Sequence, residues 1–251
     1  MTDLKTFLIV CPFVLLAGFV DAIGGGGGLI SLPAYLIAGL PAHQAIATNK
    51  LSSTCGTFLA TVRFIRQGLV NWTLAIPSVL AGLCGAGLGA NLSLLVDTDV
   101  LTRVLYVVLP VTAVLVLKKD VLHDTARAAG TGRSVMLKAA AVSLAVGIYD
   151  GFYGPGTGTF LIIAFSIFAG MDVRSANGQC KVVNLTTNAT SLVVFLRSGK
   201  VVLLLGLAAA ACNMIGGWLG AGLAIKSGSR IVRPIILFVL FLLLLRIIGV
   251  Y

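Results

Sequence analysis

The 251-residue sequence contains no glutamate and only two histidines, and charged residues make up 10% of it. All eight acidic residues are aspartates, so a carboxylate cage for a metal ion has few residues to draw on. Two histidines also do not support a histidine-rich metal site or a Ser-His-Asp arrangement. The GxxxxGK[ST] phosphate loop, the usual signature of an ATP-driven pump, is absent. We therefore expect no enzymatic activity, no cofactor and no bound metal.

Apolar residues dominate what is present. The hydrophobic fraction is 58%, and soluble domains carry roughly 25% charged residues, more than twice the fraction found here. The net charge of +10 comes mainly from Lys and Arg near the ends of apolar runs, as in the cytoplasmic loops of membrane proteins. No basic stripe interleaved with aromatic residues indicates nucleic-acid binding. The five cysteines have no ligand spacing, and we expect them to be small buried hydrophobic residues.

Apolar runs bounded by turn and charge signals predict an all-α, polytopic membrane protein with 8–10 membrane segments. Most runs have about the 20 residues that cross a bilayer, but the second run of each half is too short for an untilted span. A polar stretch separates the halves, which gives three regions: a first membrane repeat at 1–117, a charged linker at 118–134 and a second membrane repeat at 135–251. The predicted segments are 4–23, 29–40, 43–65, 71–96, 100–117, 135–153, 157–171, 175–196, 201–225 and 231–249.

The two halves match each other in sequence. At an offset of 129, Gly18, Asp21, Gly25 and Gly27 fall on Gly147, Asp150, Gly154 and Gly156, and after a two-residue insertion the offset becomes 131. The second offset superposes Gly39, Ala45, Lys50, Arg66, Gly68, Val70, Gly85 and Gly89 on Gly170, Ala176, Lys181, Arg197, Gly199, Val201, Gly216 and Gly220. We interpret this as an internal duplication.

The positive charges bear on how the halves are oriented. If the short segment dips in and out on the far side, there are eight spans, and the Lys and Arg outside the embedded positions Lys50, Lys181 and Arg246 divide ten against five. If the first two segments form a hairpin or two crossings, the division is eleven against four. The sharper division favours the second topology, in which the halves are inverted and two glycine turns meet near the midplane.

Five consecutive glycines, Gly24 to Gly28, interrupt the first apolar run, and Gly154 to Gly158 form a second glycine-rich turn. Each glycine costs about 1 kcal/mol relative to alanine inside a helix, so these stretches predict helix breaks. Helices should restart at Leu29 and at about Thr159, with unpaired N–H groups at their N-termini. Paired breaks in two halves point to a transporter's binding site. The alternative is that the glycines only permit tight helix packing, as we expect for Gly85/Gly89 and Gly216/Gly220.

Two lysines, Lys50 and Lys181, lie several residues inside predicted spans. An ionisable residue at that depth is costly and is a candidate functional residue. Both are flanked by amide and hydroxyl side chains suited to a small oxyanion. The alternative is that the lysines pair with Asp21 or Asp150 and hold helices together. The two aspartates precede the turns, where they could cap the loops or serve a coupling role.

These considerations predict a substrate-binding set drawn from both halves, with no catalytic or metal-binding residue. Thr187 and Asn188 are further polar candidates on the segment of Lys181. The predicted set is Gly25, Gly26, Gly27, Gly28, Asn49, Lys50, Ser53, Gly154, Gly156, Thr157, Gly158, Gln179, Lys181 and Asn184, with Asp21 and Asp150 for coupling or loop capping.

The paired motifs resemble the TauE/SafE family of sulfite and organosulfonate exporters. The resemblance rests on Gly18-Phe-Val-Asp-Ala-Ile-Gly-Gly-Gly-Gly-Gly-Leu-Ile-Ser-Leu-Pro33, the run to Ala47-Thr-Asn-Lys50, and Gly147-Ile-Tyr-Asp-Gly-Phe-Tyr-Gly-Pro-Gly-Thr-Gly158. It implies a multi-pass permease of the bacterial inner membrane that moves small sulfur-containing anions, such as sulfite or sulfoacetate. A passive anion channel built from the same groups is the alternative. The expected partners are a small anion and lipid, with no nucleic acid, and the oligomeric state is left open, a homodimer included.

Overall fold

The computed structural model describes residues 3–97, 99–100, 132–228, 230–231 and 234–235. Within these ranges all regular structure is helical, which confirms the all-α class. The helices are α1 (Leu4–Gly24), α2 (Gly28–Ile37), α3 (Ala42–Arg66), α4 (Trp72–Leu95), α6 (Arg133–Phe152), α7 (Thr157–Ala169), α8 (Val173–Arg197) and α9 (Leu203–Ser227). The predicted segments 100–117 and 231–249 and the linker at 118–134 lie almost entirely outside the described residues.

Four of these helices, α1, α4, α6 and α9, are long and apolar enough to cross a membrane. They expose large aliphatic side chains such as Leu80, Leu88, Leu207 and Leu219, which suits contact with lipid. Helices α2 and α7 have 10 and 13 residues. At 1.5 Å per residue they extend about 15 and 20 Å, shorter than the hydrocarbon core of about 30 Å.

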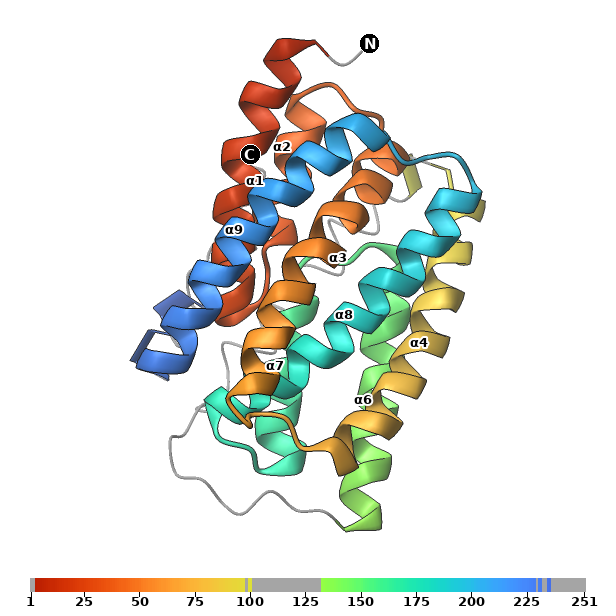
Figure 1. Ribbon diagram of the computed structural model, residues 1–251. Helices are drawn as coiled ribbons and strands as arrows, with labels where there is room; N and C mark the ends of the chain where they lie inside the picture. Colours follow the sequence, from red (N-terminus) through yellow and green to blue (C-terminus); the bar gives the residue numbers. More distant parts are fainter. Residues whose placement is uncertain (1–2, 98, 101–131, 229, 232–233, 236–251) are drawn as a thin grey trace.

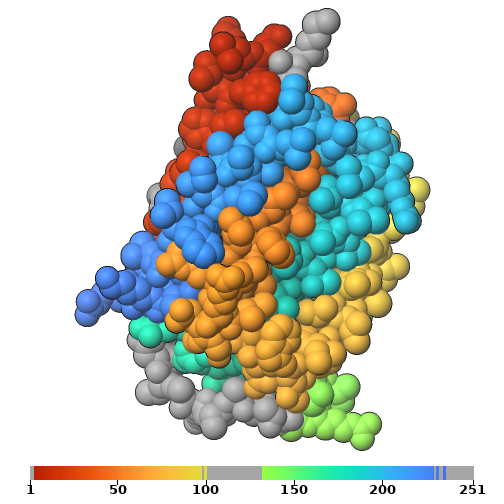
Figure 2. All heavy atoms as spheres, viewed as in Figure 1, coloured from red at the N-terminus to blue at the C-terminus, as the bar shows by residue number. Residues whose placement is uncertain are grey.

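The long helices form two outer pairs around a central pair (Figure 1). Helices α1 and α9 lie together on one side, α4 and α6 on the other, and α3 and α8 between them. On the face shown in Figure 2, α9, α3 and α8 lie side by side, and their side chains fill the spaces between the ribbons. The central helices carry most of the buried polar residues, among them Lys50, Asn184 and Lys181. The polar groups are therefore gathered inside an apolar shell.

Glycines allow the outer pairs to approach closely. A Cβ atom on Gly85 or Gly89 of α4 would collide with backbone carbonyl oxygens of α6. The equivalent glycines of α9, Gly216 and Gly220, face backbone carbonyl oxygens of α1 in the same way. The predicted packing role of these glycines is confirmed.

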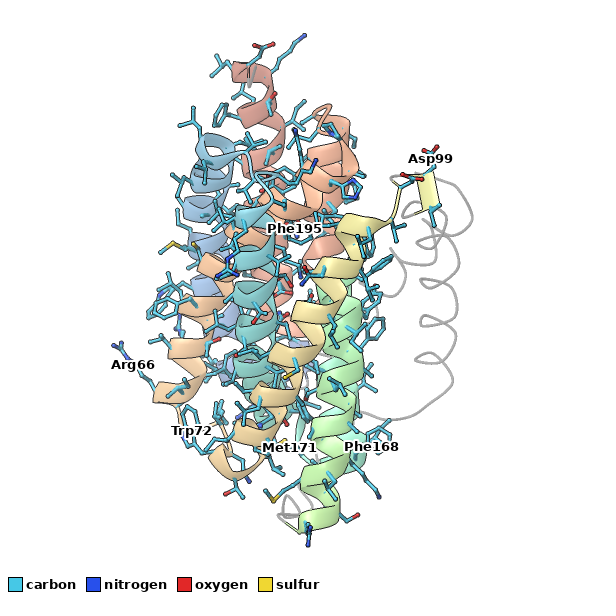
Figure 3. All side chains as sticks on the ribbon, turned by 90° about the vertical axis from the view of Figure 1, so that its right-hand side faces the viewer. Arg66, Trp72, Asp99, Phe168, Met171 and Phe195 are labelled. Carbon is cyan, nitrogen blue, oxygen red and sulfur yellow. The ribbon has the colours of Figure 1, made fainter. Side chains whose placement is uncertain are left out.

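The two central helices run in opposite directions. In Figure 3, α8 runs from near Met171 at the lower end to Phe195 in the upper half, whereas α3 ends at Arg66 at the lower end. These helices are equivalent in the sequence repeat, so opposite directions are compatible with inverted halves. The inversion of the halves across a bilayer stays a prediction.

The cysteines depart in part from the expectation. Cys180 is buried and Cys11, Cys55 and Cys212 are half-buried, but Cys84 is exposed. The prediction of burial is wrong for Cys84 because this residue lies on the outer surface of α4, where an apolar side chain can face lipid.

Candidate functional site

Both glycine-rich stretches form helix breaks. Helix α1 ends at Gly24, and Gly25 and Gly26 have φ values of 76° and 82° before α2 begins at Gly28. In the second half, Gly154 and Gly156 have φ values of 101° and 84° before α7 begins at Thr157. Positive φ is cheap only for glycine. The glycines are thus needed for the path of the backbone.

The two turns touch each other. The hydroxyl of Thr159 donates a hydrogen bond of 2.8 Å to the carbonyl oxygen of Gly24. A Cβ atom added to Gly158 would lie 2.7 Å from Cα of Gly25, so no side chain fits between the backbones there. On α8, Asn177 donates to the carbonyl oxygen of Ile23 at 2.8 Å and fixes the end of α1. The breaks of the two halves therefore form one structure.

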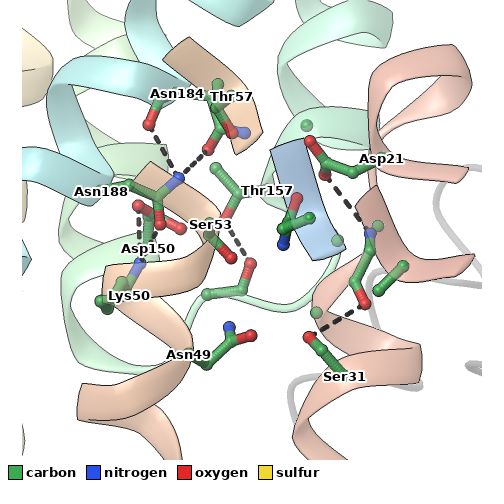
Figure 4. A pocket seen from close by; sticks show the side chains of 18 residues that line it. Asp21, Ser31, Asn49, Lys50, Ser53, Thr57, Asp150, Thr157, Asn184 and Asn188 are labelled. Atoms are coloured by element: carbon green, nitrogen blue, oxygen red, sulfur yellow. Dashed lines mark hydrogen bonds and ion pairs between the residues drawn. The ribbon is translucent and has the colours of Figure 1, made fainter. Parts of the chain in front are cut away.

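A small pocket with a cavity volume of about 30 Å³ lies beside the two turns. In Figure 4, Asn49, Lys50 and Ser53 of α3 lie on one side, Asp21 and Ser31 lie on the other, and Thr157 lies between them. The lining consists of Ala17, Asp21, Gly26, Gly27, Gly28, Ser31, Asn49, Lys50, Ser53, Thr57, Asp150, Gly154, Gly156, Thr157, Gly158, Asn184, Asn188 and Asn213. Most of these residues are polar or are glycines that expose backbone.

The N-termini of α2 and α7 both open onto this pocket through Gly28, Thr157 and Gly158. Neither end has a side-chain cap hydrogen bond, and among the described helices only α4 and α8 have one, from Asn71 and Asp172. The first turn of a helix has N–H groups without intrahelical acceptors and carries roughly half a positive charge. Two such ends facing one pocket are suited to an anion.

Each half's lysine pairs with the other half's aspartate. Lys50 Nζ lies 2.8 Å from Asp150 Oδ2, and Lys181 Nζ lies 2.9 Å from Asp21 Oδ2. The alternative foreseen from the sequence, structural pairing of the lysines, is therefore present in this conformation. Contact of either lysine with an anion stays a prediction.

The two pairs differ in their position relative to the pocket. Lys50 lines the pocket, and its Nζ also donates a hydrogen bond of 3.1 Å to Asn188 Oδ1. Lys181 is fully buried, does not line the pocket, and also donates to the backbone carbonyl oxygen of Asp21. Only one of the two predicted lysines thus faces the space in which a ligand would sit.

Asn49 carries an unused acceptor at the pocket. The residue is 7% exposed, and its Oδ1 atom is buried with no hydrogen-bond partner. An unpartnered buried polar atom is unfavourable, by roughly 1–3 kcal/mol. The side-chain oxygen of Asn49 could therefore accept a hydrogen bond only from a ligand that carries a donor.

Thirteen of the sixteen predicted residues line the pocket, and three do not: Gly25, Gln179 and Lys181. Gly25 packs against Gly158, and Gln179 Oε1 accepts a hydrogen bond of 3.2 Å from the backbone N–H of Asn71. The amide of Gln179 therefore holds the start of α4. Lys181, as described above, is turned to Asp21.

The aspartates bond to the turns in different ways. Asp21 Oδ1 accepts from the N–H of Gly27 at 3.3 Å, and its backbone oxygen accepts from Gly25 at 2.8 Å. Asp150 Oδ1 instead accepts from the hydroxyl of Thr157 at 2.9 Å. A coupling role for either residue stays a prediction.

Four lining residues were not among the sequence candidates: Ala17, Ser31, Thr57 and Asn213. Thr57 lies four residues after Ser53, so helical spacing on α3 could have identified it. Ser31 lies one turn into α2 and donates to the carbonyl oxygen of Gly27 at 3.2 Å. Asn213 is an amide in an otherwise apolar run of α9, which is a detectable signal, but its glycine counterpart in the first half, Gly82, removed it from the repeat pattern.

Sequence comparison agrees with the motifs at this site. Residues 10–247 match the family model for the sulfite exporter TauE/SafE. The chain belongs to the TauE/SafE family. It is 36% identical over 246 residues to the probable membrane transporter protein ORF9 of Sinorhizobium sp., which covers 98% of this chain and 93% of that protein.

Two further relatives of the TauE/SafE chain are similar over nearly full length. The probable membrane transporter protein YfcA of Escherichia coli K12 is 32% identical over 248 residues, covering 95% of this chain and 91% of that protein. A probable membrane transporter protein of Haemophilus influenzae is 33% identical over 245 residues, covering 96% and 93%. No solved structure matches the chain.

Membership of the TauE/SafE family, together with several apolar helices, identifies a multi-pass bacterial membrane protein of a transporter family. Such a family gives no support for an enzymatic function.

Proposed function

We propose that this TauE/SafE protein is a secondary transporter of small sulfur-containing anions, such as sulfite or organosulfonates. The observation that carries the proposal is the meeting of two uncapped helix N-termini, α2 and α7, at one pocket that also holds the ammonium group of Lys50. Backbone N–H groups and one ammonium group match an oxyanion, whose oxygens accept several hydrogen bonds.

The sulfur-containing substrate class is supported by the family, whose model is described as a sulfite exporter. The size of the pocket also suits a small ligand. The two turns beside it lie backbone against backbone, and the cavity volume is about 30 Å³. A ligand with a long apolar part would have to extend out of this space.

The proposed mechanism is alternating access around the pocket. Equivalent helices that run in opposite directions, and lysine–aspartate pairs that cross between the halves, support two related arrangements of the halves in which the pocket opens to one side at a time. In each arrangement the anion would contact the N-termini of α2 and α7.

Counterflow in liposomes tests this proposal against a passive channel. Purified protein is reconstituted, the vesicles are loaded with unlabelled methanesulfonate or sulfite, and entry of the labelled anion is followed. For a carrier, internal anion accelerates labelled uptake because loaded sites return faster than empty ones. Uptake that is fast but indifferent to internal anion would instead identify a channel, and no flux of either anion would contradict the substrate class.

A further inference from the structure

The charged side chains that line the pocket are two carboxylates and one ammonium group, those of Asp21, Asp150 and Lys50. The second ammonium group, on Lys181, is buried behind Asp21 and bonded to it. Each carboxylate thus has one lysine partner, and these four side chains sum to zero charge. An anion that enters finds the partial charges of two helix ends but no unpaired cationic side chain.

The two carboxylates are not equally accessible from the pocket. The side chain of Asp150 is 3% exposed, and its oxygens contact Lys50 at 2.8 Å and Thr157 at 2.9 Å. The side chain of Asp21 is 22% exposed, and its Oδ1 atom has only a long contact of 3.3 Å with the N–H of Gly27. Asp21 Oδ1 is therefore the carboxylate atom that can receive a proton through the pocket.

We propose that Asp21 takes up one proton when the anion binds, so that anion and proton cross the membrane together. This inference rests on the proposed transport function. An O–H bond forms on Asp21 Oδ1 with a proton from water on the side of entry, and the same proton leaves to water on the other side. The Asp21–Lys181 pair then changes from neutral to +1, which balances a monoanion.

The positive charge that appears is already held in place. Lys181 keeps its hydrogen bond to the backbone carbonyl oxygen of Asp21 when the carboxylate is neutralised. A negative ligand beside the carboxylate in turn favours the neutral carboxylic acid, since like charges disfavour each other. Anion binding and proton binding at Asp21 therefore reinforce each other.

The other titratable side chains near Asp21 each have a hydrogen-bond or ion-pair partner of their own. From α8, the thiol of Cys180 donates to the carbonyl oxygen of Gly158, and Lys181 is the ion-pair partner. Lys50 from α3 and Asp150 from α6 neutralise each other. The pocket-lining residues of α2, α7 and α9 are glycines, Ser31, Thr157 and Asn213, none of which titrates near neutral pH.

The test uses labelled methanesulfonate, which keeps a charge of −1 at every pH used, so that the ligand itself carries no proton. Vesicles with the wild-type protein receive an inward gradient of one pH unit, with the membrane potential clamped by K⁺ and valinomycin. Coupling of one proton to one anion predicts about tenfold accumulation, because the two gradients balance at equal free energy. A dye inside the vesicles should acidify as the anion enters, and changing the potential should leave the accumulation unchanged.

Asp21→Asn is the informative variant and Asp172→Asn is its control. Asp172 lies outside the pocket and caps α8, a role that Asn also fills well. In Asp21→Asn the accumulation should fall from about tenfold to none, and any remaining counterflow should no longer depend on pH. Asp172→Asn should accumulate the anion like the wild type. If Asp21→Asn does not fold, the wild-type stoichiometry still decides.

Three results would overturn the inference. They are wild-type accumulation that follows the potential or a Na⁺ gradient instead of pH, anion entry without internal acidification, and pH-driven accumulation that survives in Asp21→Asn. In each of these cases counterflow by the wild type would leave the transport proposal intact. Absence of wild-type counterflow would contradict the transport proposal itself, and with it the inference.

Discussion

At the scale of residues, two lysines at equivalent positions of the repeat have different surroundings. Lys50 faces the pocket between Asp150 and Asn188, and Lys181 is sealed against Asp21. The sequence could predict both lysines because a charge inside a membrane segment is rare. It could not predict which one reaches the pocket, since that depends on how the halves pack.

Removing the ammonium of Lys50 should have two separable effects. Lys50→Ala leaves the buried carboxylate of Asp150 without its partner, a change that costs about 3–5 kcal/mol in proteins. The double variant Lys50→Gln/Asp150→Asn removes both charges and should recover much of the folded protein, but not anion binding. The folded fraction is measured by size-exclusion chromatography in detergent and binding by titration. Binding that returns together with folding would mean that Lys50 has only a structural role.

Gly25 and Gly39 offer a matched comparison of backbone strain with and without crowding. Both have positive φ, 76° and 88°, but a Cβ atom on Gly25 would collide with the second glycine turn, and one on Gly39 would meet nothing within 4 Å. Gly39→Ala should cost about 1 kcal/mol and retain transport. Gly25→Ala should cost several times more, seen as loss of monodisperse protein. Similar thermal stability of the two variants would show that the turns do not hold each other as described.

At the scale of elements, the helix boundaries were predictable and the contacts of the helices were not. The eight described helices agree with the predicted segments within three residues; the largest difference is a predicted end at 40 against Ile37. Gly68 and Gly199, with φ of 69° and 67°, follow the ends of α3 and α8. A glycine after an apolar run is a signal for a helix end, so these ends could be predicted from the sequence. Helix α1 packs against α9, and α4 packs against α6. The only sign of this pairing in the sequence is the spaced glycines.

The close packing of α4 can be tested by comparing substitutions at two of its glycines, Gly89 and Gly87, which lie two residues apart. A Cβ atom on Gly89 would overlap the carbonyl oxygen of Ile148 in α6, whereas one on Gly87 would make an ordinary contact of 3.7 Å with Thr190. Gly89→Ala should lower stability by about 1–3 kcal/mol through overpacking. Gly87→Ala should leave it unchanged or raise it by up to about 1 kcal/mol through helix propensity. Thermal unfolding in detergent measures both, and equal midpoints would argue against the α4–α6 contact.

At the scale of the whole molecule, the halves complete each other. Each of the two lysine–aspartate pairs joins a residue of one half to a residue of the other. The same is true of the two outer helix pairs and of the contact between the two glycine turns. The duplication was visible in the sequence as residues in step at offsets of 129 and 131. The crossing of the pairs was not visible, because a repeat aligns equivalent positions and gives no information about which residues touch.

Neither half should therefore fold by itself. Residues 1–117 and 135–251, expressed separately, should be degraded or aggregate, because each exposes an unpaired lysine and a glycine face. Co-expression of the two pieces should restore a complex that purifies through a tag on one of them. A monodisperse, thermally cooperative single half would show that the repeats are independent units.

The most direct test of the site is anion binding to the purified protein, followed as a change in its unfolding temperature. A ligand at a hundred times its Kd stabilises the folded state by about 2.7 kcal/mol. We predict that sulfite and methanesulfonate raise the unfolding temperature of the wild type, and that the rise is lost in Lys50→Gln/Asp150→Asn but kept in Asp172→Asn. No rise with either anion, or an equal rise in all three proteins, would contradict an anion site between the two glycine turns.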